Sequence, residues 1–242
     1  MNSRVLIAHL TSLTLILLPT IHAADRAVEK EERPWCDSFS PYKADLSDSG
    51  KNPFFFLWPS YRLLLQGGKE TRAISVLNET KIIDGVKTRV IEDRRTKDGK
   101  LIEVSRSYVA ISRTTGDVYC FGKDVDAYKN GKLIGHEGTW MAGANGARLG
   151  LLMPGRPAVG DKYHREVAPG VAMDRAEVIS TTETLTTPTK VFERCLRTRE
   201  SSSLTSRSED TLYAPDVGLI KAGNLMLTGI DCPLCKGTKA AP

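Results

Sequence analysis

Residues 71–112 read TRAISVLNETKIIDGVKTRVIEDRRTKDGKLIEVSRSYVAIS, and this stretch decides the fold. Its three runs are rich in β-branched and aromatic residues, and apolar and polar residues alternate along them, as in strands with one buried face. Asp84-Gly85 and Asp98-Gly99 separate the runs, and such pairs adopt the left-handed φ values that a tight hairpin needs. The stretch therefore predicts three antiparallel strands joined by two hairpins.

The same pattern continues on both sides of this stretch. Asn130-Gly131 and the TTGD sequence of residues 114–117 add two turns, and no long helical period with caps interrupts the runs. Because the runs are apolar mostly on one side, we predict an all-β domain built as a single antiparallel meander, which forms a curved sheet or an incomplete barrel. The expected strands are residues 61–66, 71–82, 86–95, 101–112, 117–122, 132–139, 161–167, 173–185, 190–199, 207–214 and 217–228.

Residues 142–160 lack this alternation and are rich in Gly, Ala and Pro. We expect a long loop that crosses one end of the sheet, and loops of this length in compact domains are often functional. In the last expected strand, Gly218 and Gly223 are candidates for β-bulges.

The N-terminal region has the composition of a secretory signal peptide. Arg4 supplies a positive charge, residues 5–21 are mostly apolar, and Ala23 and Ala24 are small residues suited to a cleavage site. The apolar run is too short for a membrane span, which needs about 20 firmly apolar residues. We therefore expect a secreted or periplasmic protein without an integral membrane segment after cleavage near Ala23 or Ala24.

The chain is expected to divide into four parts: the signal peptide at residues 1–24, an extended lead-in at 25–51, the β domain at 52–228 and a C-terminal tail at 229–242. A length of 242 residues suits one globular domain or two small ones. With 34 Lys and Arg against 29 Asp and Glu, the net charge of +5 is small beside the total, so the composition does not favour nucleic acid as a partner.

All five cysteines follow the expected signal peptide. In an oxidising compartment we expect a disulfide from Cys36 to Cys232 or Cys235, or one within the Cys232–Cys235 motif. Because five is an odd number, at least one thiol is left over or is shared between chains. A redox pair, a zinc or copper half-site and a haem-attachment site are weaker interpretations, because the motif follows the last strand and few further ligands are available. We predict no metal and no cofactor.

Several short phrases of the sequence are similar to one family. They are Asn52-Pro53-Phe54-Phe55, Ile83-Asp84-Gly85-Val86-Lys87-Thr88-Arg89-Val90, Phe121-Gly122-Lys123-Asp124-Val125, Gly138-Thr139-Trp140, Met153-Pro154 with Val159-Gly160-Asp161, and Tyr213-Ala214-Pro215 with Val217-Gly218-Leu219. Over residues 52–222 the chain resembles a group of exported bacterial β-rich proteins whose activity is not established. The resemblance implies a single β-rich domain. The chain departs from the pattern at residues 58–61, which lack a Pro-Gly turn, and at Cys120, which replaces an aromatic residue.

Three carboxylates flank the expected loop, and they are the candidates for catalysis: Glu137, Glu166 and Asp174. If the loop folds back, they could act as a general acid and base, or hold Ca²⁺. The alternative is that they pair with basic residues on a solvent-exposed face, where alternate charges are usual. No Gly-x-Ser-x-Gly or His-Glu-x-x-His motif occurs, and His164 is expected at the surface or rim of the sheet.

Five large apolar residues are the candidates for binding: Phe55, Phe56, Tyr61, Trp140 and Met153. They either fill the core or line an apolar pocket in a curved sheet. The leading interpretation is an exported soluble binding module, without recognisable catalytic machinery, which holds a small apolar ligand or a segment of an envelope protein. The alternatives are a carboxylate-dependent hydrolase or lyase, and a structural or envelope-assembly protein.

Overall fold

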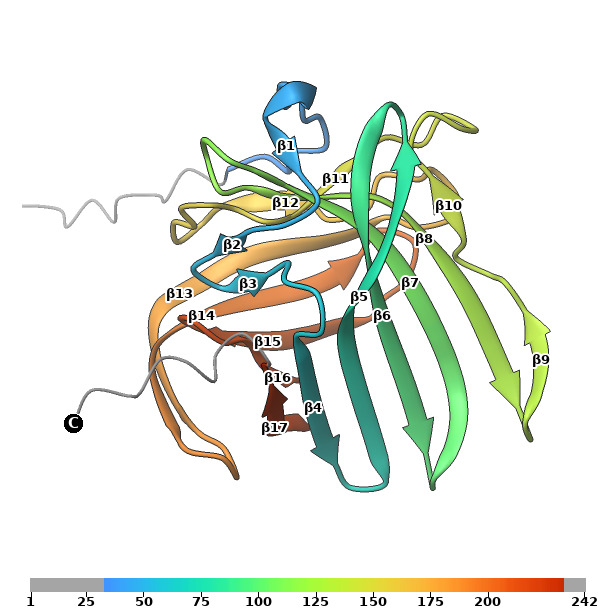
Figure 1. Cartoon of the computed structure of the whole chain (residues 1–242). Helices are drawn as coiled ribbons and strands as arrows, with labels where there is room; N and C mark the ends of the chain where they lie inside the picture. The colour runs from blue at the N-terminus through green and yellow to red at the C-terminus, as the bar shows by residue number, and fades with distance from the viewer. Residues whose placement is uncertain (1–32, 233–242) are drawn as a thin grey trace, which may run out of the picture. The chain divides into compact units, whose positions relative to one another are not determined.

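The hairpin turns lie where the sequence predicts them. The computed structural model describes residues 33–232, and in it Asp84, Asp98 and Asn130 have φ angles of 48°, 51° and 52°. Asp, Asn and Gly tolerate these left-handed values best, which explains the composition of the turns. Five successive antiparallel strands lie side by side (Figure 1): β4 (Arg62–Gly67), β5 (Glu70–Ile83), β6 (Val86–Lys97), β7 (Lys100–Ser112) and β8 (Val118–Lys129).

A second group of antiparallel strands follows in the chain. Its members are β12 (Lys162–His164), β13 (Asp174–Thr186), β14 (Val191–Ser202), β15 (Ser208–Ala214), β16 (Gly218–Ala222) and β17 (Leu225–Asp231). The segment expected as one strand at 217–228 is therefore two strands, because the chain reverses at Gly223, whose φ is 55°.

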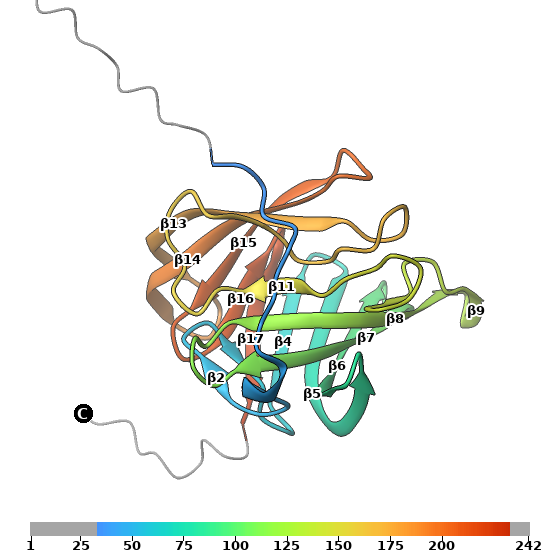
Figure 2. The same cartoon turned by 90° about the horizontal axis from the view of Figure 1, so that it is seen from above.

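Strand β17 joins the two groups, because it pairs with β4 from Met226 opposite Gln66 to Asp231 opposite Arg62. The order across the sheet is β10-β8-β7-β6-β5-β4-β17-β16-β15-β14-β13-β12, where β10 is Trp140–Met141, and the sheet does not close into a barrel. Seen from above, β13–β15 and β5–β8 lie on two sides of the molecule (Figure 2). The prediction of an all-β fold with a curved antiparallel sheet is confirmed.

Short elements attach the lead-in and the expected crossing loop to this sheet. The lead-in forms the 3₁₀ turn η1 (Lys43–Asp45), β1 (Leu46–Ser47), which pairs with β7, and β2 (Lys51–Asn52), which pairs with β3 (Phe55–Phe56). Within the expected loop at residues 142–160, β11 (Gly150–Met153) pairs with β8. β8 also pairs with two strands that precede this loop, β9 (Lys132–Gly135), which is shorter than the strand expected at 132–139, and β10 (Trp140–Met141).

The crossing segment lies close to the chain that follows β12. A Cβ atom at Gly150 would lie 2.1 Å from the carbonyl oxygen of Arg165, so only glycine permits this approach. The contact fixes Arg165 and Glu166 relative to β8 and β11, and both side chains line the cavity described below.

Buried apolar side chains form two clusters on opposite faces of the sheet. On β7, Val109 belongs to one cluster and its neighbour Ala110 to the other, and neither side chain is exposed. The first cluster contains Leu65, Leu196 and Leu227 from the β4–β17 junction and the second group of strands. The alternation of side chains along each strand is the reason that neighbours enter different clusters.

Asn52 anchors the aromatic segment 54–56 to the rest of the fold. Its side-chain amide donates hydrogen bonds to the carbonyl oxygens of Gly116 (3.0 Å) and Pro154 (2.8 Å), while its Oδ1 accepts one from the N–H of Phe54 (2.7 Å). The residue is 1% exposed. Water therefore cannot replace these partners without rearrangement of the segment.

Replacing Asn52 by Ala should lower the free energy of unfolding by about 3 kcal/mol, because buried backbone groups lose their partners. Urea denaturation measures this change. Ser49→Ala, at an exposed position of the same segment, is the control and should change the stability little. Equal stabilities of the two variants would contradict the anchoring role of Asn52.

Candidate functional site

The concave side of the bent sheet contains a cavity of about 830 Å³. Both groups of strands contribute to its walls: β4–β8 on one side, and β13–β16 with the residues that follow β12 on the other. The exposed residues Val171 and Leu204 also belong to the lining, so the cavity reaches solvent beside the turns that carry them. Its volume lies within the range of roughly 300–1,000 Å³ that is typical of small-molecule sites.

Part of the cavity lining is apolar. It contains three residues predicted for binding, Phe55, Phe56 and Tyr61, together with Phe54 and Leu63. The rings of Phe56 and Tyr61 stack with centroids 5.1 Å apart, and the Tyr61 hydroxyl donates a hydrogen bond of 2.6 Å to the carbonyl oxygen of Val217. Burial raises the pKa of Tyr61, so the hydroxyl remains a neutral donor.

The other two residues predicted for binding lie outside the cavity lining. Met153 is 1% exposed and belongs to the first apolar cluster, and Trp140 is 5% exposed and belongs to the second. Both are on short strands that pair with β8, and this pairing turns their side chains into the core. Of the two interpretations from the sequence, filling the core rather than lining a pocket therefore describes Met153 and Trp140.

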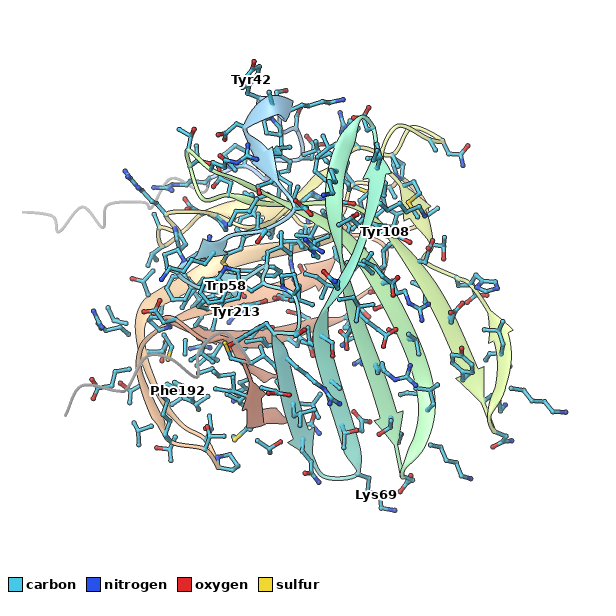
Figure 3. All side chains as sticks on the ribbon, in the orientation of Figure 1. Tyr42, Trp58, Lys69, Tyr108, Phe192 and Tyr213 are labelled. Carbon is cyan, nitrogen blue, oxygen red and sulfur yellow. The ribbon has the colours of Figure 1, made fainter. Side chains whose placement is uncertain are left out.

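Another part of the cavity lining carries charged side chains that sequence analysis missed. Arg72 of β5 forms an ion pair with Asp93 of β6 (Nη2 to Oδ2, 2.7 Å), and Arg165 forms one with Glu200 of β14. The hydroxyl of Tyr213 donates a hydrogen bond of 2.7 Å to Glu200. Figure 3 shows Tyr213 in the middle of the molecule, far from the exposed turn at Lys69.

The electrostatics of this cluster follow from burial and pairing. Burial alone would lower the pKa of Arg165, but the carboxylate of Glu200, together with Tyr213, Tyr163 and Asp174, outweighs this effect, and the pKa lies above its usual value. The same balance, with Asp93 as the partner, raises the pKa of Arg72. Burial, and then Glu200, raise the pKa of Tyr213. The two arginines are therefore charged and Tyr213 is neutral at physiological pH.

Three buried polar atoms of this region have no hydrogen-bond partner within residues 33–232: Asp93 Oδ1, Arg165 Nε and Thr211 Oγ1. All three residues line the cavity, and Thr211 is only 2% exposed. Buried polar groups are nearly always hydrogen-bonded, so unpartnered ones beside a cavity are candidates for contact with a ligand or ordered water.

Glu137, Glu166 and Asp174, the three residues considered for catalysis, all line the cavity. Lys123 of β8 donates to both carboxylate oxygens of Glu166, at 2.8 and 3.0 Å. Burial would lower the pKa of Lys123, yet Glu166 first and Asp174 to a lesser extent raise it. Lys123 is therefore protonated, and Glu166 is fully engaged as its counter-ion rather than free to transfer a proton.

The two histidines of the described region have different surroundings. His136 lies 2.9 Å from Asp126 and is exposed. His164, expected at the surface or rim, is instead 7% exposed, and burial lowers its pKa. The expectation was wrong because the lead-in covers β12. The backbone N–H of His164 donates a hydrogen bond of 2.8 Å to the backbone carbonyl oxygen of Cys36, and the ring centroids of Trp35 and His164 lie 6.1 Å apart.

The structure contradicts a disulfide at Cys36, which is an exposed free thiol. Cys36 lies beside β12 at one end of the sheet, whereas Cys232 follows β17, five positions away in the strand order. Cys232 is not free, and Cys235 lies outside the described residues, so a bond within the motif stays a prediction.

No group of three or more His, Cys, Asp or Glu side chains in the described part of the chain could hold a metal ion. Within residues 33–232, no helix has the length and apolar character that crossing a membrane requires.

The fold and the cavity define an all-β protein with a cavity whose lining includes an apolar part and a charged part. No protein-family model and no curated protein matches the chain. A solved structure described as "a putative lipoprotein from Parabacteroides distasonis ATCC 8503" is similar, with 11% identity and a TM-score of 0.36 over 76% of this chain and 100% of that chain. A TM-score this low supports no conclusion about a shared fold or function.

Iodoacetamide should modify Cys36 in the folded, unreduced protein and leave Cys120 and Cys195 intact. Both of the latter are 0% exposed, and burial raises the pKa of Cys120 to about 12. Peptide mass mapping before and after unfolding in guanidinium tests this. Recovery of Cys36 in a disulfide-linked peptide would contradict the structure, and Cys36→Ser should abolish the native-state modification.

Lys123→Met should lower the free energy of unfolding by about 3–5 kcal/mol at neutral pH, because it leaves the Glu166 carboxylate without its cation. The double variant Lys123→Met with Glu166→Gln should recover much of this loss. A double-mutant cycle by urea denaturation measures the coupling. Additive effects of the two substitutions would show that the pair does not act as a unit.

The contribution of this pair should also depend on pH. Since folding raises the pKa of Lys123 above its usual value of 10.5, the pair stabilises the fold fully at lower pH and loses this effect as the pH rises through the folded-state pKa. The coupling energy should therefore be constant around neutral pH and fall under alkaline conditions.

Proposed function

We propose that this protein is an exported binding protein that holds an amphipathic ligand in the cavity of its bent sheet. The observation that carries the proposal is the division of the cavity of about 830 Å³ into the apolar wall around Phe55 and the charged region around Arg165. Ligand sites commonly combine an apolar lining with a few polar groups that fix orientation.

The charged region changes the ligand class expected from the sequence. A purely apolar ligand would leave Asp93 Oδ1 and Arg165 Nε without partners and would cover charged side chains with apolar surface, which is unfavourable. An amphipathic ligand avoids this cost, because its polar end can bind these groups while its apolar end contacts Phe54 and Phe55.

Export is part of the proposal and rests on the sequence of residues 1–24, which lie outside the described residues. The charged start, the apolar run and the small residues Ala23 and Ala24 support cleavage there. An exported carrier would meet amphipathic molecules of the cell envelope, and such a ligand would bind with its apolar part removed from water.

A carboxylate-dependent hydrolase or lyase is the second candidate, and one observation favours it: Glu137, Glu166 and Asp174 line one cavity. The ion pair between Glu166 and Lys123 weakens it, since both Glu166 oxygens accept hydrogen bonds. Asp174→Asn and Glu137→Gln would abolish turnover of a substrate by such an enzyme without a change in its melting temperature.

A protein for envelope assembly would instead co-purify with a stable partner and contain an empty cavity.

The wild type should bind the fluorescent amphiphile N-phenyl-1-naphthylamine saturably, and Ser107→Trp should weaken this binding at least about tenfold. Ser107 is a half-buried residue of the cavity wall, so the indole would occupy the space that the probe needs without removing a core side chain. Fluorescence titration measures the affinity.

Ile134→Ala, which shortens an exposed side chain on β9, is the matched control and should bind as the wild type does. Native mass spectrometry of protein purified from its own compartment provides the second readout and should detect a bound species. Absence of saturable binding together with an empty protein would overturn the proposal, as would equal affinity of Ser107→Trp and the wild type.

A further inference from the structure

We propose that the charged part of the cavity selects amphiphiles with a cationic amine head group. This inference rests on the proposed function, because it specifies the ligand class of the same cavity. It depends on an imbalance of charge along the cavity wall and on unpartnered acceptor atoms beside it.

Seven acidic and five basic side chains line the cavity, although the whole chain carries a net charge of +5. Each of the five basic groups lies within 4.0 Å of a lining carboxylate. Within the described part of the chain, Glu137 and Asp174 are the two lining carboxylates without an ion pair of this kind. The cavity wall therefore has an excess of two negative charges.

One of the two excess charges, that of Asp174, acts on both Lys123 and Arg165. The ammonium group of Lys123 is already bound to Glu166 at 2.8 and 3.0 Å, and the charge of Asp174 also acts on it. Glu137 and Gly138 line the same cavity from the turn that follows β9. Lys123 thus interacts with two carboxylates, Glu166 and Asp174, and Glu137 adds a further acidic group to the cavity wall. A second cation brought by a ligand would reduce the repulsion among these charges.

Thr211 and Asp93 provide an independent indication. Thr211 is 98% buried and lines the cavity, yet its Oγ1 has no hydrogen-bond partner within residues 33–232, and the same holds for the Oδ1 of Asp93. Both atoms can accept hydrogen bonds, and an ammonium group offers three donors. The unpartnered Nε of Arg165 instead requires an acceptor, which a hydroxyl or ester oxygen next to the amine would supply.

An anionic head group fits this surface poorly. The guanidinium groups of Arg72 and Arg165 are bound by Asp93 and Glu200, so neither cation is free to neutralise a carboxylate or phosphate. The anion would also approach the unpaired carboxylates of Glu137 and Asp174, which line the cavity at exposed positions and would repel it.

Three ligands with the same tail test the inference: dodecylamine, dodecanol and dodecanoate, each used below its critical micelle concentration. Displacement of N-phenyl-1-naphthylamine should show dodecylamine to bind at least about tenfold more tightly than dodecanol, and dodecanoate to bind most weakly. The preference should fall as the salt concentration rises, since screening weakens partly exposed charges.

The double variant Glu137→Gln with Asp174→Asn removes the excess charge without breaking an ion pair. It should lose the preference for dodecylamine about tenfold and retain its affinity for dodecanol. Glu79→Gln with Glu193→Gln is the matched control, because it removes two exposed acidic charges that do not line the cavity. This control should keep the wild-type preference.

The outcomes separate the two proposals. If dodecanol and dodecylamine bind equally, or dodecanoate binds most tightly, the head-group inference is overturned and the binding function stands. If the control variant loses the preference as much as the cavity variant does, the selectivity comes from the overall charge, and the inference is again wrong. If none of the three ligands binds, the proposed function fails with it.

Discussion

The pairing of β17 with β4 is the constraint on which the rest of the structure depends. It connects strands whose register partners, such as Leu65 and Leu227, are more than a hundred residues apart in the sequence. Both side chains are almost completely buried and belong to the first apolar cluster. This pairing makes one continuous sheet of two hairpin groups, and the bend of that sheet produces a concave side with walls from both groups.

A concave side with charged residues has an energetic cost, and the ion pairs limit it. Removing Arg72 or Arg165 from water is unfavourable, and their partners Asp93 and Glu200 compensate only with good geometry. Such pairs contribute little to stability compared with apolar residues of similar size, so their presence in a cavity is better explained by binding than by folding. The apolar clusters supply the stability, and in the proposed binding function the charged region would supply the specificity.

Local sequence determines the strands and turns, whereas distant pairing and the contents of the concave face depend on the whole fold. Asp84-Gly85 is sufficient to predict a hairpin because two neighbouring residues set its conformation. Nothing local indicates that β17 returns to β4, or that the lead-in covers His164. The position of Arg72 and Asp93 in the cavity was not predicted for a related reason. Charged residues that alternate with apolar ones are also typical of a strand with one solvent-exposed face.

One signal for the charged region was nevertheless present in the sequence. On β5, Arg72 shares a face with the apolar residues Ile74 and Val76, and on β6 Asp93 shares one with Ile91. In the paired strands Val76 lies opposite Ile91 and Ile74 opposite Asp93, so the change from apolar to charged residues occurs in the same direction on both. The polarity of the cavity lining therefore changes along the length of β5 and β6. An elongated amphipathic ligand that follows this gradient would lie along β5 and β6, with its apolar end toward Val76 and its polar end toward Arg72.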